Sequence, residues 1–113
     1  MENKRIETIE LPNRKFTVKT DKVEINMGRG HDLAVISGPC VIDSKELIMN
    51  TARQLVDITQ KLGIGLIFKS SFEKDNRGSE KNWKGPLAEE GLKILAGVRK
   101  EFGIPVLTDV HRV

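Results

Sequence analysis

The sequence predicts a parallel α/β fold preceded by a short antiparallel hairpin. Short apolar runs begin at Leu33, Gly65 and Ile104, and a helix-like pattern separates each run from the next. The runs therefore start about 32 and 39 residues apart, which is the spacing of βαβ units. An order of strand, helix, strand, helix, strand is typical of a parallel sheet covered by helices.

The hairpin is predicted from two short stretches in which apolar and polar side chains alternate. They occupy residues 15–19 and 23–27, with a short polar turn between them. Alternation of this kind predicts half-buried strands. We therefore expect an N-terminal extension over residues 1–30 that contains the hairpin, and a second region over residues 31–113 that contains the parallel sheet.

The first apolar run, residues 33–37, predicts a fully buried strand of the parallel-sheet type. A helix is expected to begin at Asp43 or Ser44, because either side chain can cap a helix, and Glu46 stands where a capping-box partner would. Gly63 is a good C-terminal stop for this helix. The apolar residues that repeat at helical spacing are Leu47, Ile48, Ala52, Leu55, Ile58 and Leu62.

The second half repeats the same order of elements. A buried strand is predicted over residues 65–69, and a polar loop follows it to about residue 86. A second helix is expected over about 87–102, and a third strand over 104–108, with Pro105 near its start, where a missing N–H is tolerated. The side chains expected to face inward from the second helix are Leu92, Leu95 and Phe102.

Composition narrows the classes of function. The net charge of +3 is dispersed, and a nucleic-acid binder would usually show a basic stripe with aromatic side chains near it. No apolar run is long enough to span a membrane, and the first residues lack the apolar core of a secretory signal. The single cysteine fits a reducing cytoplasm. We expect a cytoplasmic protein with neither a nucleic-acid nor a membrane partner.

The end of the sequence carries a further expectation. No helical pattern follows the third predicted strand, and a parallel sheet needs both of its faces covered. The sequence therefore predicts that these 113 residues are part of a longer domain.

Side chains suited to catalysis or ligand binding follow each of the three predicted strands. The carboxyl ends of parallel strands lie at one edge of a sheet, where α/β proteins bind their ligands. Cations and hydroxyl donors suit a phosphate or a carboxylate, although a solvated loop of ordinary charges is the alternative. Lys69 and Ser71 share strand parity and should point to one side. The candidates are Cys40, Lys69, Ser71, Lys74, Asn76, Arg77, Asp109 and His111.

Two of these positions leave alternatives open. Cys40 could ligate a metal or act as a nucleophile, but a lone cysteine is more often a small buried apolar residue. Asp109 and His111, two residues apart, could face one site together or form a plain hydrogen-bonded pair.

Residues 68–79, F-K-S-S-F-E-K-D-N-R-G-S, resemble the signature F-K-[AS]-S-[FY]-[DE]-K-A-N-R-[ST]-S of the 3-deoxy-D-manno-octulosonate 8-phosphate synthases. The stretches at 37–40, 85–86, 89–92 and 108–111 agree with this family too, so the likeness runs from about residue 33 to residue 111, nearly all of the predicted folded part. The related heptulosonate 7-phosphate synthases carry K-P-R-[TS] in place of K-x-N-R. The resemblance implies the first three or so units of a TIM (β/α)8 barrel. The sequence departs from the pattern at Asp75, Gly78, Lys84 and Leu87.

The resemblance also implies a reaction and its residues. Phosphoenolpyruvate, D-arabinose 5-phosphate and water would give 3-deoxy-D-manno-octulosonate 8-phosphate and phosphate, in the synthesis of the lipopolysaccharide sugar Kdo. Lys69 and Lys74 match residues that bind phosphoenolpyruvate. The positions that match the arabinose 5-phosphate site are Ser71, Asn76, Arg77 and Asp109, and the catalytic pair is Lys74 with Asp109.

By the same resemblance, Cys40 would ligate a divalent metal, with zinc, iron or manganese as the expected ions. A cytoplasmic homotetramer is implied for the full-length form. Two alternatives stand beside this hypothesis: a heptulosonate synthase that uses erythrose 4-phosphate, and an inactive fragment of the synthase.

Overall fold

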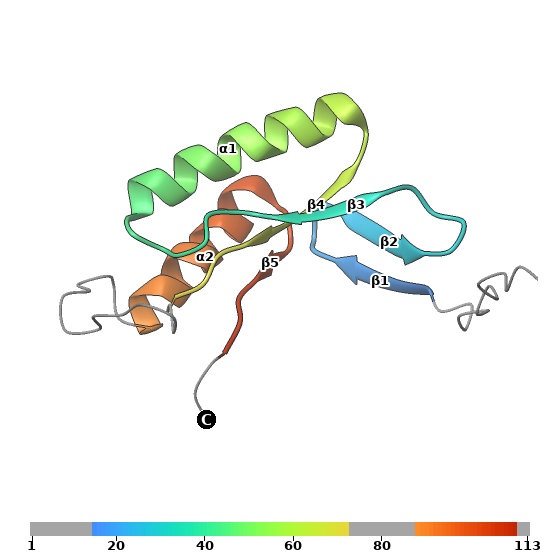
Figure 1. Cartoon of the computed structure of the whole chain (residues 1–113). Helices are drawn as coiled ribbons and strands as arrows, with labels where there is room; N and C mark the ends of the chain where they lie inside the picture. The colour runs from blue at the N-terminus through green and yellow to red at the C-terminus, as the bar shows by residue number, and fades with distance from the viewer. Residues whose placement is uncertain (1–14, 73–87, 111–113) are drawn as a thin grey trace, which may run out of the picture.

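The computed structural model describes residues 15–72 and 88–110, and its elements follow the predicted order (Figure 1). An antiparallel hairpin precedes a parallel sheet in which β4 lies between β3 and β5. The elements are β1 (Lys15–Lys19), β2 (Glu24–Gly28), β3 (Ala34–Ser37), α1 (Lys45–Leu62), β4 (Gly65–Lys69), α2 (Ala88–Phe102) and β5 (Val106–Leu107).

The hairpin lies at the end of the sheet where β3 and β4 begin (Figure 1). Its buried anchor is Ile25, which contacts Gly65; a Cβ on this glycine would lie 2.9 Å from the Ile25 Cγ2 atom. At the hairpin turn, the Thr20 hydroxyl donates a hydrogen bond to the Gly103 carbonyl at the end of α2. The predicted hairpin is thus confirmed, while the division of the chain at residue 30 stays a prediction.

Helix α1 begins and ends where its caps predict. The Ser44 hydroxyl accepts a hydrogen bond from the Leu47 N–H, and Gly63 closes the helix in the left-handed conformation. Ser44 rather than Asp43 is therefore the N-cap. This places Glu46 one position too early to be a capping-box partner, so that part of the prediction was wrong.

The apolar repeat of α1 is divided between core and surface. The buried face of the helix consists of Ile48, Ala52 and Thr59, with Leu55 half-buried beside them. The other three residues at helical spacing, Leu47, Ile58 and Leu62, are exposed.

One of the three inward-facing positions predicted for helix α2 was wrong. Leu95 is buried and Phe102 is half-buried, as predicted, but Leu92 is 48% exposed. Gly91 takes the inward position instead, and a Cβ there would lie 2.8 Å from the Phe72 Cβ. The absence of a side chain at Gly91 thus lets α2 approach the end of β4 closely.

The core lies between the sheet and the two helices, which cover the same face. Phe68 of β4 is fully buried at its centre. The Arg53 guanidinium of α1 lies 5.9 Å from the centre of the Phe102 ring of α2, which adds a cation–π contact between the helices. The buried members of the core are Ile42, Ile48, Ala52, Leu66, Phe68, Leu95, Val98 and Ile104.

Two expectations about strands were wrong. β3 is not fully buried, because Ile36 is 53% exposed on the sheet face that no helix of the described ranges covers. β5 is shorter than predicted and contains two residues. Pro105 lacks an N–H and so cannot donate to a ladder, although its carbonyl accepts from the Phe68 N–H at 2.9 Å.

A parallel sheet with both helices on one face is compatible with the N-terminal part of a (β/α) barrel. No helix within residues 15–72 and 88–110 has the length and apolar character needed to cross a membrane.

Candidate functional site

An open pocket of about 370 Å³ lies at the carboxyl ends of β3, β4 and β5. The lining side chains lie at the carboxyl edge of the sheet. Parallel α/β proteins bind their ligands at this edge. The lining residues are Ile36, Ser37, Gly38, Pro39, Cys40, Lys69, Ser70, Ser71 and Asp109.

The pocket brings together four of the residues that the sequence singled out. Cys40 comes from the segment after β3, Lys69 and Ser71 from the end of β4, and Asp109 from the segment after β5. Ser70, which has the opposite strand parity, lines the pocket as well, so the prediction that Lys69 and Ser71 point to one side stays a prediction. The predicted residues that lie outside the described ranges are Lys74, Asn76, Arg77 and His111.

Two hydrogen bonds join the end of β4 to the end of β5 beside the pocket. The Ser71 hydroxyl donates to the Asp109 carboxylate, which joins the end of β4 to the end of β5. One residue earlier, the Ser70 N–H donates to the Leu107 carbonyl at 3.3 Å. Asp109 is thus oriented by a neighbour, as a carboxylate must be if it is to contact a ligand in one defined geometry.

Cys40 is exposed at this pocket. The alternative that it is a small buried apolar residue was therefore wrong. An accessible thiol suits a soft or borderline metal ion. Within residues 15–72 and 88–110, however, no three His, Cys, Asp or Glu side chains form a group that could hold a metal. Among the described residues, Cys40 could therefore serve a metal only as one ligand of an incomplete set.

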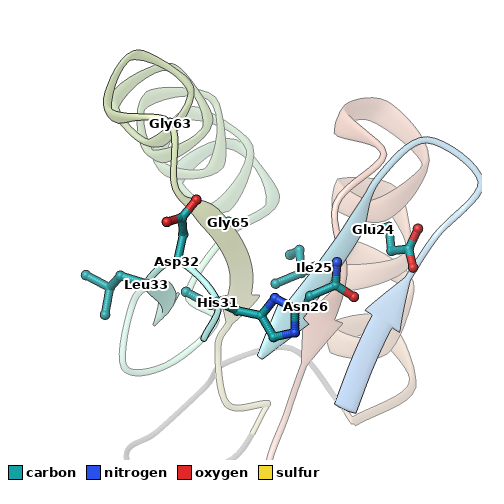
Figure 2. Close-up of a pocket in the computed structure, with 9 residues that line it drawn as sticks. Glu24, Ile25, Asn26, His31, Asp32, Leu33, Gly63 and Gly65 are labelled. Atoms are coloured by element: carbon teal, nitrogen blue, oxygen red, sulfur yellow. The ribbon is translucent and has the colours of Figure 1, made fainter. Parts of the chain in front are cut away.

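A second pocket, of about 210 Å³, lies at the opposite end of the sheet, between the hairpin and the start of β3 and β4 (Figure 2). Its polar side chains include Glu24, Asn26, His31 and Asp32. None of the site residues predicted from the sequence lies there. The predicted site residues that the structure describes therefore lie together at the carboxyl ends of the strands.

Comparison with known proteins places the chain in a family. Residues 11–113 match the family described as the DAHP synthetase I family. The chain belongs to the DAHP synthetase I family. The match covers every element of the described structure, including the hairpin and the pocket at the strand ends.

Several curated relatives of the chain are named 2-dehydro-3-deoxyphosphooctonate aldolase. The protein from Bordetella bronchiseptica is 53% identical over 88 residues, which is 78% of this chain and 31% of the relative. The protein from Stenotrophomonas maltophilia strain K279a is 55% identical over 85 residues, or 75% of this chain and 31% of the relative. A third, from Methylococcus capsulatus, is 53% identical over 85 residues. The chain spans about a third of the length of the curated relatives it matches.

Gly38 and Ser70 also line the pocket, and neither was assigned a role from the sequence. Ser70 is almost completely buried, and its hydroxyl donates a hydrogen bond to the Pro39 carbonyl. Gly38 lies against the Lys69 carbonyl so closely that any side chain would collide with it. A polar residue at a core-facing strand position could have indicated Ser70, because such a hydroxyl needs a partner. The need for Gly38 depends on a contact between segments distant in sequence.

Proposed function

We propose that the chain is the N-terminal part of a (β/α)-barrel synthase that condenses phosphoenolpyruvate with D-arabinose 5-phosphate. The observation that carries the proposal is the gathering of Lys69, Ser71 and Asp109 around one pocket at the carboxyl ends of parallel strands. The K-x-N-R stretch, with Lys74, follows this strand end directly in the sequence. The names of the curated relatives support the same reaction class.

The proposed roles follow the charges of the substrates. Lys69 and Lys74 bind the carboxylate and phosphate of phosphoenolpyruvate. Arg77 binds the phosphate of arabinose 5-phosphate, for which a guanidinium offers a bidentate fork. Ser71 and Asn76 complete the sugar site. Asp109 contacts the sugar hydroxyls, and its hydrogen bond from Ser71 supports the idea that it is held for this purpose.

In the proposed reaction, C3 of phosphoenolpyruvate attacks the aldehyde carbon of arabinose 5-phosphate. Water adds at C2, and phosphate leaves with cleavage of its C–O bond. The cationic side chains bring two anions together and neutralise their repulsion, so that the reacting carbons are held within reach. Lys74 and Asp109 are the proposed catalytic residues, one at each substrate.

We also propose that Cys40 supplies one ligand to a divalent metal, with zinc, iron or manganese as the expected ions. Its exposed thiol at the pocket supports this role. When bound, such a metal would polarise the aldehyde or position the water. A cytoplasmic homotetramer, serving lipopolysaccharide synthesis, is the proposed assembly and setting of the full-length form.

The proposal is tested by a two-aldehyde assay on the complete gene product. Purified protein is incubated with phosphoenolpyruvate and either arabinose 5-phosphate or erythrose 4-phosphate, and phosphate release is followed while mass spectrometry identifies the sugar acid. We expect the eight-carbon product from arabinose 5-phosphate. A seven-carbon product from erythrose 4-phosphate would favour the heptulosonate synthase instead. If folded protein with added metal forms no product from either aldehyde, the result would favour the alternative of an inactive fragment.

A further inference from the structure

Ser70 occupies a position in β4 and its extension where an apolar side chain would be expected. Side chains in a strand alternate between faces, so Ser70 shares its face with Leu66 and Phe68. Both of these residues belong to the core between the sheet and the helices. Ser70 is 1% exposed, yet it carries a hydroxyl. A buried hydroxyl is costly unless it forms a hydrogen bond, so its partner shows what the residue does.

The partner is the backbone of the segment that carries Cys40. The Ser70 hydroxyl donates a 2.6 Å hydrogen bond to the Pro39 carbonyl, across a separation of 31 residues in the sequence. This carbonyl belongs to the residue immediately before Cys40. The hydrogen bond therefore joins the end of β4 to the chain at the point where it carries the thiol.

Further contacts hold the same two segments together. The Ile42 N–H donates to the Ser71 carbonyl at 2.9 Å, and the Ser71 N–H donates to the Cys40 carbonyl at 3.4 Å. Val41 and Ser71 form a parallel bridge. Residues 38–42 thus continue alongside the end of β4 after the regular ladder of β3 has ended.

Close backbone contact completes this arrangement. A Cβ on Gly38 would lie 1.9 Å from the Lys69 carbonyl oxygen, a separation that no side chain can occupy. The glycine therefore lets the segment reach the surface of β4 where Ser70 can bind it. Gly38 allows the approach, and Ser70 fixes its register.

We propose that Ser70 is a positioning residue, whose hydrogen bond to Pro39 holds Cys40 in place at the pocket beside Lys69 and Asp109. Ser70 acts through the backbone and does not contact substrate. The positional part of this inference stands on the contacts above. Its functional part rests on the proposed role of Cys40 as a metal ligand.

The positional part is tested by amide hydrogen exchange, measured by NMR on the protein and on its Ser70→Ala variant. The Ile42 N–H reports opening of the 38–42 segment, while the Phe68 N–H, bonded to Pro105, reports the stability of the sheet. We expect protection at Ile42 to fall about fivefold, the factor for the net free energy of one hydrogen bond, with little change at Phe68. Unchanged protection at Ile42, or an equal fall at both amides, would overturn the proposal.

Ser37→Ala is the matched control for this measurement. Ser37 lines the same pocket, but its side chain forms no hydrogen bond with another residue of the described ranges. Removing its hydroxyl should therefore leave protection at Ile42 unchanged. A fall at Ile42 as large as that in Ser70→Ala would show that any lost hydroxyl loosens the segment, which contradicts a specific role for Ser70.

The functional part is tested with Co²⁺ alone, added to the complete gene product. A thiolate–cobalt absorption band should form and should disappear in Cys40→Ala. We expect the dissociation constant for Co²⁺ to rise about fivefold in Ser70→Ala and to stay unchanged in Ser37→Ala. Equal affinities in the protein and in Ser70→Ala would overturn this part. A band that survives in Cys40→Ala would contradict the proposed metal ligand, while hydrogen exchange would still decide whether Ser70 positions the segment.

Discussion

The Ser71 hydroxyl donates a hydrogen bond to the Asp109 carboxylate, and this contact joins the ends of two parallel strands across 38 positions of sequence. Both side chains line the pocket at the carboxyl edge of the sheet. Substitution of Ser71 can therefore distinguish the proposed arabinose 5-phosphate site from the proposed phosphoenolpyruvate site.

Replacing Ser71 by alanine should impair use of the sugar phosphate more than use of phosphoenolpyruvate. Asp109 would lose a partner that orients it toward the sugar hydroxyls, and a hydrogen bond to a charged group contributes about 1.5–3 kcal/mol. We expect kcat/KM for arabinose 5-phosphate to fall by about tenfold or more, with the KM for phosphoenolpyruvate nearly constant. Steady-state phosphate release measures both. A parallel rise in the KM of both substrates would count against the assignment of Asp109 to the sugar.

Lys74→Ala should abolish turnover by the complete gene product. The side chain is proposed to bind phosphoenolpyruvate, and loss of a group that stabilises transition-state charge typically lowers kcat by about a hundredfold or more. Lys93→Ala is the control, because Lys93 lies on the exposed face of α2 and pairs only weakly with Glu89 at the surface. Near-normal product formation by Lys74→Ala would contradict the proposed function.

Asp75→Ala should improve the binding of phosphoenolpyruvate. Asp75 places a negative charge between Lys74 and the Asn76-Arg77 pair, where the related synthases carry a small residue. Removing a like charge next to residues that bind an anion changes the binding free energy by up to about 1 kcal/mol, so we expect the KM for phosphoenolpyruvate to fall by about two- to fivefold. The gain should shrink as salt is added, because screening weakens the repulsion. A KM that rises in Asp75→Ala would show that the carboxylate itself contributes to the site.

Ser44→Ala should destabilise the protein by about 1 kcal/mol. The change removes the acceptor of the Leu47 N–H at the start of α1. Asp43→Ala is the matched control, since the neighbouring carboxylate does not cap the helix. Urea denaturation followed by circular dichroism measures both. The assignment of the cap fails if Asp43→Ala lowers the free energy of unfolding more than Ser44→Ala does.

Two glycine substitutions should change stability in opposite directions. Gly38→Ala introduces a Cβ against the Lys69 carbonyl, and relief of such overpacking typically costs about 1–3 kcal/mol. Gly97→Ala meets nothing within 4 Å and lies inside α2, so it should stabilise the helix by up to about 1 kcal/mol. Thermal denaturation of the two variants gives the comparison. A Gly38→Ala protein as stable as the parent would contradict the tight contact at the pocket.

The sequence by itself determined the order of elements, the end of α1 at Gly63 and its start to within one residue. These features depend on local chemistry: alternation predicts the hairpin, the Ser44 hydroxyl accepts from the free Leu47 N–H at the start of α1, and Gly63 adopts the left-handed conformation that ends the helix. The sequence also predicted that Lys69, Ser71, Asp109 and Cys40 would meet, because parallel strands bring their carboxyl ends to one edge.

The tertiary structure decided which side chains face the core and which contacts hold the site. Periodicity placed Leu92 inside, yet Gly91 faces inward, because the close approach of α2 to Phe72 leaves no space for a side chain there. The hydrogen bonds of Ser70 to Pro39 and of Ser71 to Asp109 join residues more than thirty positions apart. Such pairings cannot be predicted from local sequence, because they form only when the sheet brings the strand ends together.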